Sequence, residues 1–324
     1  MGYDASALSE AELLRQARLL LDTGLYRAGY RVLRLGDTGR FVAPEAIAAS
    51  LRSQGFQLDL TFAAATAPEE ARRRLEALGA QMATIVAVGD RDAARRLADA
   101  LPAGTRIAVS DGKGLSWAAD FANVVDLNNI SAGDDFFEIT RNRLDSCRDG
   151  DTDVSRSEAN LRNTAIGKNG GAWCPGNLPL RFDACRNEAI FAQYCMLGCP
   201  LVLDGDIAGY SVEKLALLRR DALIDIARRG CGRVARYYDP WHVLLVKPLD
   251  SRRGYVMILN RCHGDQPTNF LPGDMGWTGR FSLRQLPENT LVGANLETFE
   301  VHVETSDHPE TPCCRIYLAE LLSE

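Results

Sequence analysis

The most constraining feature of this chain is a regular alternation between short apolar runs and longer amphipathic runs, which lasts from the first residue to about residue 235. The apolar runs predict buried strands at 1–3, 30–35, 56–62, 82–88, 106–109, 124–127, around Trp173, and at 199–203. Helical periodicity lies between them at 11–21, 44–54, 68–78, 91–101, 134–144 and 186–197. Such alternation implies a parallel sheet in an α/β protein, and eight strand–helix units predict a (β/α)8 barrel.

The sequence pattern changes after Pro240. Short strand patterns, punctuated by Gly, Pro, Asn and Asp, replace the helical ones at 243–246, 255–259, 280–283, 298–303 and 315–318. These predict a small antiparallel β-sandwich. We therefore expect a barrel domain over 1–238 and a C-terminal sandwich over 239–324.

Composition limits the partners. The net charge of −6 argues against non-specific nucleic-acid binding, and no apolar run is long enough to span a membrane. The N-terminus lacks a basic and apolar leader, which predicts a cytoplasmic protein, or a secreted one if a signal was removed beforehand. The sequence leaves the oligomeric state open.

The nine cysteines show no C-x-x-C spacing. Cys195 and Cys199 are one helical turn apart and could bind a metal, but no histidine precedes His242. Buried free thiols in a reducing compartment are the favoured interpretation, so we expect no metal.

The segment 171–211 carries the most specific motif. Trp173, Pro175 and Leu178 are followed, after a predicted helix, by Pro200-Leu201 and then Asp206. This stretch resembles the last two strand–helix units of the α-galactosidase-like glycoside hydrolases, families 27 and 36 of clan D, whose pattern is W-N-D-P-D-M-L and later A-P-L-L-x-x-x-D. The acidic residue before the methionine is missing, because Gly176 or Asn177 stands there.

Weaker matches to the same family follow one another in order along the chain. Met1-Gly2-Tyr3 is similar to the opening M-G-W, and residues 54–58 resemble the K-G-L-K-L of the third strand. The resemblance implies a barrel with a C-terminal sandwich, hydrolysis of O-glycosidic bonds in a galactoside or related glycoside, and no cofactor.

The resemblance also locates the catalytic nucleophile of the family, which lies in a K-Y-D motif at the end of the fourth strand. Those positions fall here on Thr84, Ile85 and Val86. A valine cannot attack an anomeric carbon, so the usual retaining mechanism is not expected. Asp90 lies four residues further on, where a helix N-terminal carboxylate is the favoured interpretation.

Other family positions are partly retained. The acid/base position falls on Asp134, which could equally cap the helix that follows it. The D-D-x-W motif of the second strand becomes Gly36-Asp37-Thr38-Gly39, and Ser6 replaces the binding tryptophan of the first strand. The acidic contact of the fifth strand is matched by Asp111.

These considerations define the candidate site. The catalytic candidates are Asp134, Asp111 and Asp37. The candidate substrate-binding residues are Asp37, Asp111, Trp117, Trp173, Asn177 and Asp204, with a tryptophan supplying the stacking face for a pyranose. Asp206 is either a further site carboxylate or a structural one.

Three hypotheses remain open. The first is a glycosidase with an altered constellation, in which two carboxyl groups roughly 6.5–9.5 Å apart support inversion through a water. The second is a non-catalytic, sugar-binding or scaffold relative that kept the barrel and lost the reaction. The third, a barrel enzyme using phosphate or a metal, has only the glycine-rich stretch 167–171 and the clustered aspartates in its favour. The polar excursion 145–171 lies over the barrel mouth or away from it.

Overall fold

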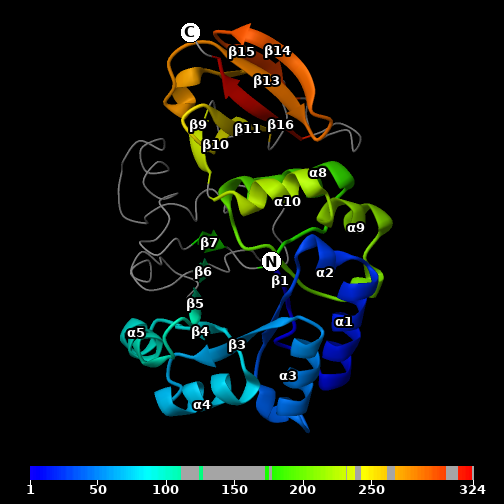
Figure 1. Cartoon of the computed structure of the whole chain (residues 1–324), viewed down its shortest axis with the longest axis vertical. Coiled ribbons are helices and arrows are strands. Elements are labelled where there is room, and N and C mark those ends of the chain that lie inside the picture. The colour runs from blue at the N-terminus through cyan, green and yellow to red at the C-terminus, as the bar shows by residue number, and fades with distance from the viewer. Residues whose placement is uncertain are drawn as a thin grey trace. The chain divides into compact units, whose positions relative to one another are not determined.

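The computed structural model of the chain describes residues 1–110, 124–126, 172–174, 177–230, 232–237, 242–260, 267–303 and 313–322 (Figure 1). By packing, these residues divide into two compact units. The first comprises the described parts of Met1–Asn129, Ile166–Leu178 and Pro200–Leu215. The second comprises those of Ile130–Ala165, Pro179–Cys199 and Ala216–Glu324.

The first unit is built on an eight-stranded parallel sheet. Its strands are β1 (Gly2–Asp4), β2 (Val32–Leu35), β3 (Gln57–Ala63), β4 (Met82–Val86), β5 (Arg106–Ser110), β6 (Val124–Asp126), β7 (Ala172–Cys174) and β8 (Val202–Leu203). Neighbours follow chain order from β1 to β7, and β8 pairs with the free side of β1. Just beyond β7, the Leu178 amide donates to the Val202 carbonyl of β8 at 2.8 Å. The predicted TIM-like barrel is therefore confirmed.

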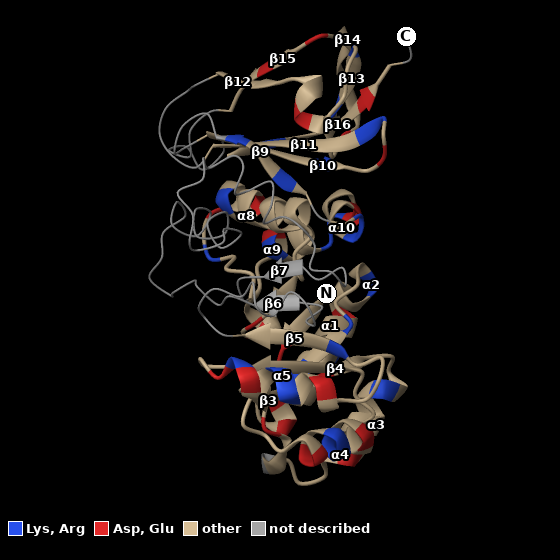
Figure 2. Cartoon of the chain, turned by 90° about the vertical axis from the view of Figure 1, so that its left-hand side faces the viewer, with Lys and Arg blue, Asp and Glu red and all other residues tan. Residues whose placement is uncertain are grey.

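The connecting helices of this unit are α1 (Glu10–Asp22), α2 (Leu25–Ala28), α3 (Pro44–Ser53), α4 (Pro68–Leu78) and α5 (Arg91–Ala100). Ser9 begins α1 in a capping box with Glu12, and a proline in the first turn begins α3 and α4. Each of the longer helices buries one apolar stripe, such as Leu13, Ala17 and Leu20 of α1. The remaining positions of α4 and α5 mix acidic and basic residues (Figure 2).

The second unit contains a six-stranded antiparallel sheet in the order β14-β13-β16-β11-β10-β9. These strands are β9 (Arg233–Tyr237), β10 (His242–Pro248), β11 (Arg253–Asn260), β13 (Phe281–Leu286), β14 (Thr290–Leu296) and β16 (Cys314–Leu321). A two-stranded sheet of β12 (Pro267–Phe270) and β15 (Phe299–His302) packs against it. Phe270 of β12 meets Phe281 of β13 edge to face, with ring centroids 5.0 Å apart. The predicted antiparallel sandwich is therefore confirmed.

Two helices of the second unit are tied to its sheet by a buried lysine. These are α8 (Ala184–Leu197) and α10 (Asp221–Arg228), which pack against each other. The Lys247 ammonium on β10 is fully buried, and it donates to the carbonyl of Cys195 at 2.9 Å and of Ile226 at 2.5 Å. These carbonyls belong to the last turns of α8 and α10, where the helix dipole favours a cation.

The antiparallel sheet begins earlier than the sequence pattern indicated. β9 lies at Arg233–Tyr237 and pairs with β10, while α8 and α10 belong to the same compact unit as the sheet. The domain boundary at 238/239 remains a prediction. Among the described residues, no helix has the length and apolar character that crossing a bilayer requires.

Candidate functional site

Three side chains meet where strands β1, β7 and β8 end. Tyr3 of β1 is in register with Leu203 of β8, so the next residues, Asp4 and Asp204, lie side by side. Asn177 follows β7 and donates through Nδ2 to Asp4 Oδ2 and to Asp204 Oδ2, at 3.1 Å each. We call Asp4, Asn177 and Asp204 the mouth cluster. It lies at the carboxyl ends of the parallel strands, which is where TIM barrels place their active sites.

The mouth cluster leaves acceptor capacity for a ligand. Asp4 Oδ1 accepts from the Ser6 amide at 2.9 Å, which fixes that carboxylate in the turn after β1. Asp204 is exposed, and a carboxylate oxygen can accept more than one hydrogen bond. The nitrogen of Asn177 lies between the two bonded oxygens, so the two carboxylates share one neutral donor.

An aromatic and a cationic side chain flank Asp204. The Tyr210 hydroxyl donates to the Asp204 carbonyl, and Lys214 Nζ of α9 (Val212–Leu218) lies 3.8 Å from the centroid of the Tyr210 ring. Burial lowers the pKa of Lys214, while the charge of Asp204 opposes that shift. Burial, followed by the charges of Asp204, Asp206 and Asp4, raises the pKa of Tyr3 to about 12, so its hydroxyl remains a donor.

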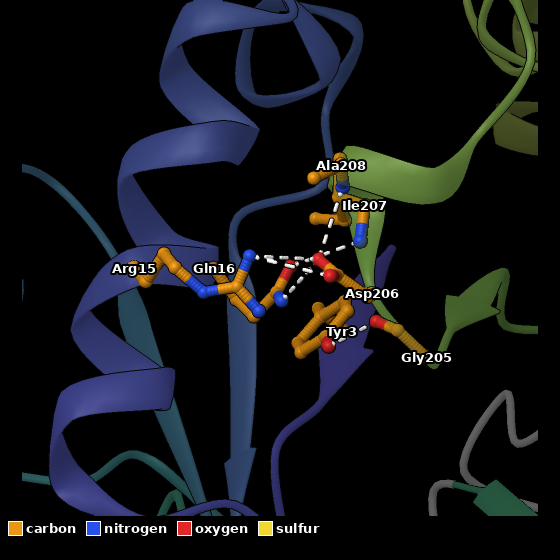
Figure 3. Close-up of polar contacts among 7 residues, drawn as sticks. All are labelled: Tyr3, Arg15, Gln16, Gly205, Asp206, Ile207 and Ala208. Atoms are coloured by element: carbon orange, nitrogen blue, oxygen red, sulfur yellow. Dashed lines mark hydrogen bonds and ion pairs between the residues drawn. The ribbon is translucent and has the colours of Figure 1, made fainter.

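Asp206 has a structural role (Figure 3). Its Oδ1 accepts from Gln16 Nε2 at 2.8 Å, from Arg15 at 3.0 Å and from the Ala208 amide at 3.1 Å. The Gln16 side chain also accepts from the Ile207 amide at 3.0 Å, so α1 is fastened to the loop after β8. The hydrogen bonds from Gln16 and Arg15 lower the pKa of Asp206 to about 2. These contacts favour the structural interpretation of Asp206 over a role as a further site carboxylate.

The barrel interior contains a charged network that the sequence analysis missed. Arg34 of β2 is in register with Asp59 of β3, and its Nε lies 3.0 Å from Asp59 Oδ2. The Thr84 hydroxyl of β4 lies 3.0 and 2.8 Å from the two Asp59 oxygens. Asp59 is only 2% exposed. Burial raises its pKa, while Arg34 and Thr84 act in the opposite direction.

One member of this network, Thr84, is at the position where the resemblance predicts the lysine of the family, and it is engaged with Asp59. Val86 is the last residue of β4, paired with Ala63 and Ser110. Asp90 accepts from the Ala93 amide at 3.0 Å and caps α5, as its position predicted.

The backbone after β2 leaves no room for a side chain at Gly36, where the resemblance predicts a carboxylate. A Cβ built on Gly36 would lie 2.3 Å from the Ser6 carbonyl oxygen, so no larger residue fits this backbone. The next residue, Asp37, is exposed, and its carboxylate accepts from the Gly39 amide at 2.9 Å in the short helix η1 (Thr38–Arg40). In the described part of the chain, no hydrogen bond joins Asp37 to the mouth cluster.

The structure therefore brings together only some of the predicted site residues. Asn177 and Asp204 meet, whereas Asp111, Trp117, Asp134 and the excursion 145–171 lie outside the described residues. Trp173 lies in β7, but its side chain is outside the described part. Asp4 was not among the predicted residues. The sequence feature that could have identified Asp4 is its place directly after the first apolar run, the same feature that singled out Asp204.

Comparison with known proteins bears on the fold. No protein-family model matches this sequence, and no curated protein sequence matches it either. Among solved structures, α-galactosidase I from Mortierella vinacea is similar with a TM-score of 0.76 at 13% identity, covering 98% of this chain and 96% of that one. An α-galactosidase from Saccharomyces cerevisiae gives a TM-score of 0.72 at 15% identity, covering 99% and 97%.

A third similar structure is a family 27 β-L-arabinopyranosidase from Geobacillus stearothermophilus, with a TM-score of 0.75 at 12% identity over 100% of this chain and 96% of that one. The chain thus has an α-galactosidase-like glycoside hydrolase fold, a TIM-like barrel followed by an antiparallel β-sandwich. At such identities the likeness concerns the fold alone.

Proposed function

We propose that this chain is a carbohydrate-active protein that binds a galactoside or related glycoside at the mouth of its barrel. The observation that carries the proposal is the mouth cluster, two carboxylates bridged by one amide at the carboxyl ends of β1, β7 and β8. The fold supports it, because the similar structures include an α-galactosidase with raffinose and an arabinopyranosidase with arabinose.

The chemistry of the mouth cluster suits sugar hydroxyl groups. Each hydroxyl can donate to a carboxylate, and charge-assisted hydrogen bonds are the stronger kind. The exposed oxygens of Asp204 and the nearby Lys214 ammonium supply an acceptor and a donor for neighbouring hydroxyls. In this proposal the cluster binds and orients the sugar.

In this proposal, hydrolysis of an O-glycosidic bond follows an altered route. Val86 offers no atom that can form a glycosyl ester, so the retaining route through β4 is closed. An inverting route needs two carboxyl groups with room for a water between them. Asp4 and Asp204 do not offer that room, because the Asn177 nitrogen lies between them. Asp134 and Asp111 remain the proposed acid and base.

The alternative function is sugar binding without turnover. It is favoured by one specific observation, the Asp59–Thr84 contact on the interior side of β4. The residue at position 84 carries no positive charge, and the cation of this network, Arg34, is paired with Asp59. A non-catalytic relative would therefore retain the mouth cluster as a binding site.

The test is a panel of aryl α-galactosides and related aryl glycosides, assayed for turnover by the wild-type protein and by Asp134→Asn and Asp204→Asn. Turnover that Asp134→Asn abolishes supports the altered glycosidase. Binding of a galactoside without turnover, weakened in Asp204→Asn, supports the alternative. If the protein neither hydrolyses nor binds any of these glycosides, both proposed functions are contradicted.

A further inference from the structure

A cavity of about 230 Å³ lies in the second compact unit, and all of its lining residues belong to that unit. Its walls come from α8, from the beginning of α10, from the end of β13 and the turn that follows it, and from the first residues of β16. Pockets for drug-sized ligands measure roughly 300–1,000 Å³. The cavity therefore fits a smaller molecule.

The polar part of the wall carries balanced charges. Arg220, at the beginning of α10, forms an ion pair with Glu188 of α8, and these side chains are 33% and 35% exposed. Arg315 and Glu288 add one further positive and one further negative group, and Gln285 adds an amide. The formal charges of the two arginines and the two glutamates therefore sum to zero.

This balance selects against ions. A charged ligand would lose hydration on entering and would meet no net opposite charge in return. A neutral molecule with several hydroxyl groups loses less, because each hydroxyl can donate to a carboxylate and accept from a guanidinium. The amide of Gln285 can do both as well.

The rest of the wall is apolar. Leu223, Leu286, Pro287 and Ile316 line it, beside the Cys314 thiol. Burial raises the pKa of Cys314, so this thiol is neutral and adds no charge to the wall. Donors and acceptors next to an aliphatic surface match a pyranose, which has hydroxyls at its rim and C–H groups on its faces.

We propose that this cavity is a second carbohydrate site, which binds one neutral monosaccharide unit and is separate from the mouth cluster. The proposal rests on the proposed function only in its choice of ligand class. The site would hold a sugar without acting on it, because glycoside hydrolysis uses two carboxyl groups and one of the two in this wall, Glu188, is engaged with Arg220.

The test is titration calorimetry of the full chain with the neutral sugars methyl α-galactoside, galactose, glucose and mannose, and with the anion galacturonate. It compares Arg315→Ala and Gln285→Ala with the control Ser282→Ala, which is on the same strand as Gln285 but does not line the cavity. All titrations use an Asp4→Asn/Asp204→Asn background, which removes the mouth cluster's charges. We expect binding of at least one of the neutral sugars, weakened about tenfold in each cavity variant and unchanged in the control.

Three results would overturn this proposal: no binding of any neutral sugar in that background, equal affinity in the cavity variants and the control, or preference for galacturonate over galactose. Thermal melting of each variant shows whether a lost signal reflects unfolding. If Arg315→Ala is unfolded, Arg315→Lys, which keeps the charge but not the planar guanidinium, replaces it with the same expectation. The background already lacks the mouth cluster's charges, so sugar binding in these titrations tests the cavity alone. The mouth cluster is tested separately by Asp204→Asn in the glycoside panel, so either proposal can fail without the other.

Discussion

At the scale of single residues, the most informative finding is a buried ion pair where a barrel interior usually has branched apolar side chains. Arg34, Asp59 and Thr84 come from three neighbouring strands, and the sequence presents them as isolated polar residues within apolar runs. Only the strand register shows that they meet. A period-2 pattern gives the face on which a residue lies, but not its neighbour across the sheet.

The first prediction concerns this pair. Arg34→Met removes the positive charge beside a carboxylate that is 2% exposed, so the free energy of unfolding at pH 7 should fall by about 3–5 kcal/mol. The loss should shrink at lower pH, because burial favours the neutral form of Asp59. Chemical denaturation measures it, with Arg18→Met in the exposed Arg18–Asp22 pair as the control. A loss no larger than the control's would refute this account.

The second prediction concerns Asp206. A carboxyl group whose pKa is lowered on folding stabilises the protein above its ordinary pKa, and the contribution disappears as pH falls through the lowered value. The melting temperature of Asp206→Asn should therefore lie below that of wild type at pH 7, and the two should converge between about pH 4 and pH 2. Asp22→Asn, in an exposed pair on α1, the helix that carries the Asp206 partners Arg15 and Gln16, is the control. A difference that is independent of pH would argue against the hydrogen bonds as its cause.

At the scale of elements, periodicity predicted β2 to β6 and the helices α1, α3, α4, α5 and α8 within about two residues, because the strands are continuous apolar runs and each helix has an apolar stripe. The predicted start of β8 was three residues too early, α2 was not predicted, and the predicted helix 134–144 lies outside the described residues. Periodicity also missed β9, β12 and β14. β14 is an edge strand whose residues are mostly exposed, so it shows no alternation of apolar and polar side chains. Asp4 was missed at the site because the first strand has only three residues. Asp204 was found because a clear apolar run precedes it.

The third prediction tests how helices α8 and α10 are held. Lys247→Met leaves the carbonyls of Cys195 and Ile226 without their ammonium donor in a buried place, which should lower the free energy of unfolding by about 1.5–3 kcal/mol. Arg253→Met removes one member of an exposed pair on the adjacent strand and should cost less than about 1 kcal/mol. Equal stability of Lys247→Met and wild type in urea would show that this lysine does not hold the two helices.

At the scale of the whole molecule, fold and chemistry were predictable to different degrees. The barrel and sandwich follow from patterns repeated over many residues, so individual substitutions leave them intact. The site depends on single residues: Val86 ends β4, Gly36 has no space for a side chain, and Asn177 bridges two carboxylates. The predictions for Asp37, Asp111, Asp134, Trp117 and Trp173 remain predictions. A galactoside ligand at the mouth is likewise a proposal.

The most direct measurement is the affinity of the full chain for methyl α-galactoside, compared by ligand-observed NMR competition between Arg315→Ala, in which the proposed cavity site is weakened, and Arg315→Ala/Asn177→Leu. Leucine is close to asparagine in size but removes the donor that aligns Asp4 with Asp204. A site at the barrel mouth predicts at least tenfold weaker binding in the double variant, with an unchanged melting profile. Unchanged affinity in a folded Arg315→Ala/Asn177→Leu protein would place the sugar elsewhere and contradict the central claim.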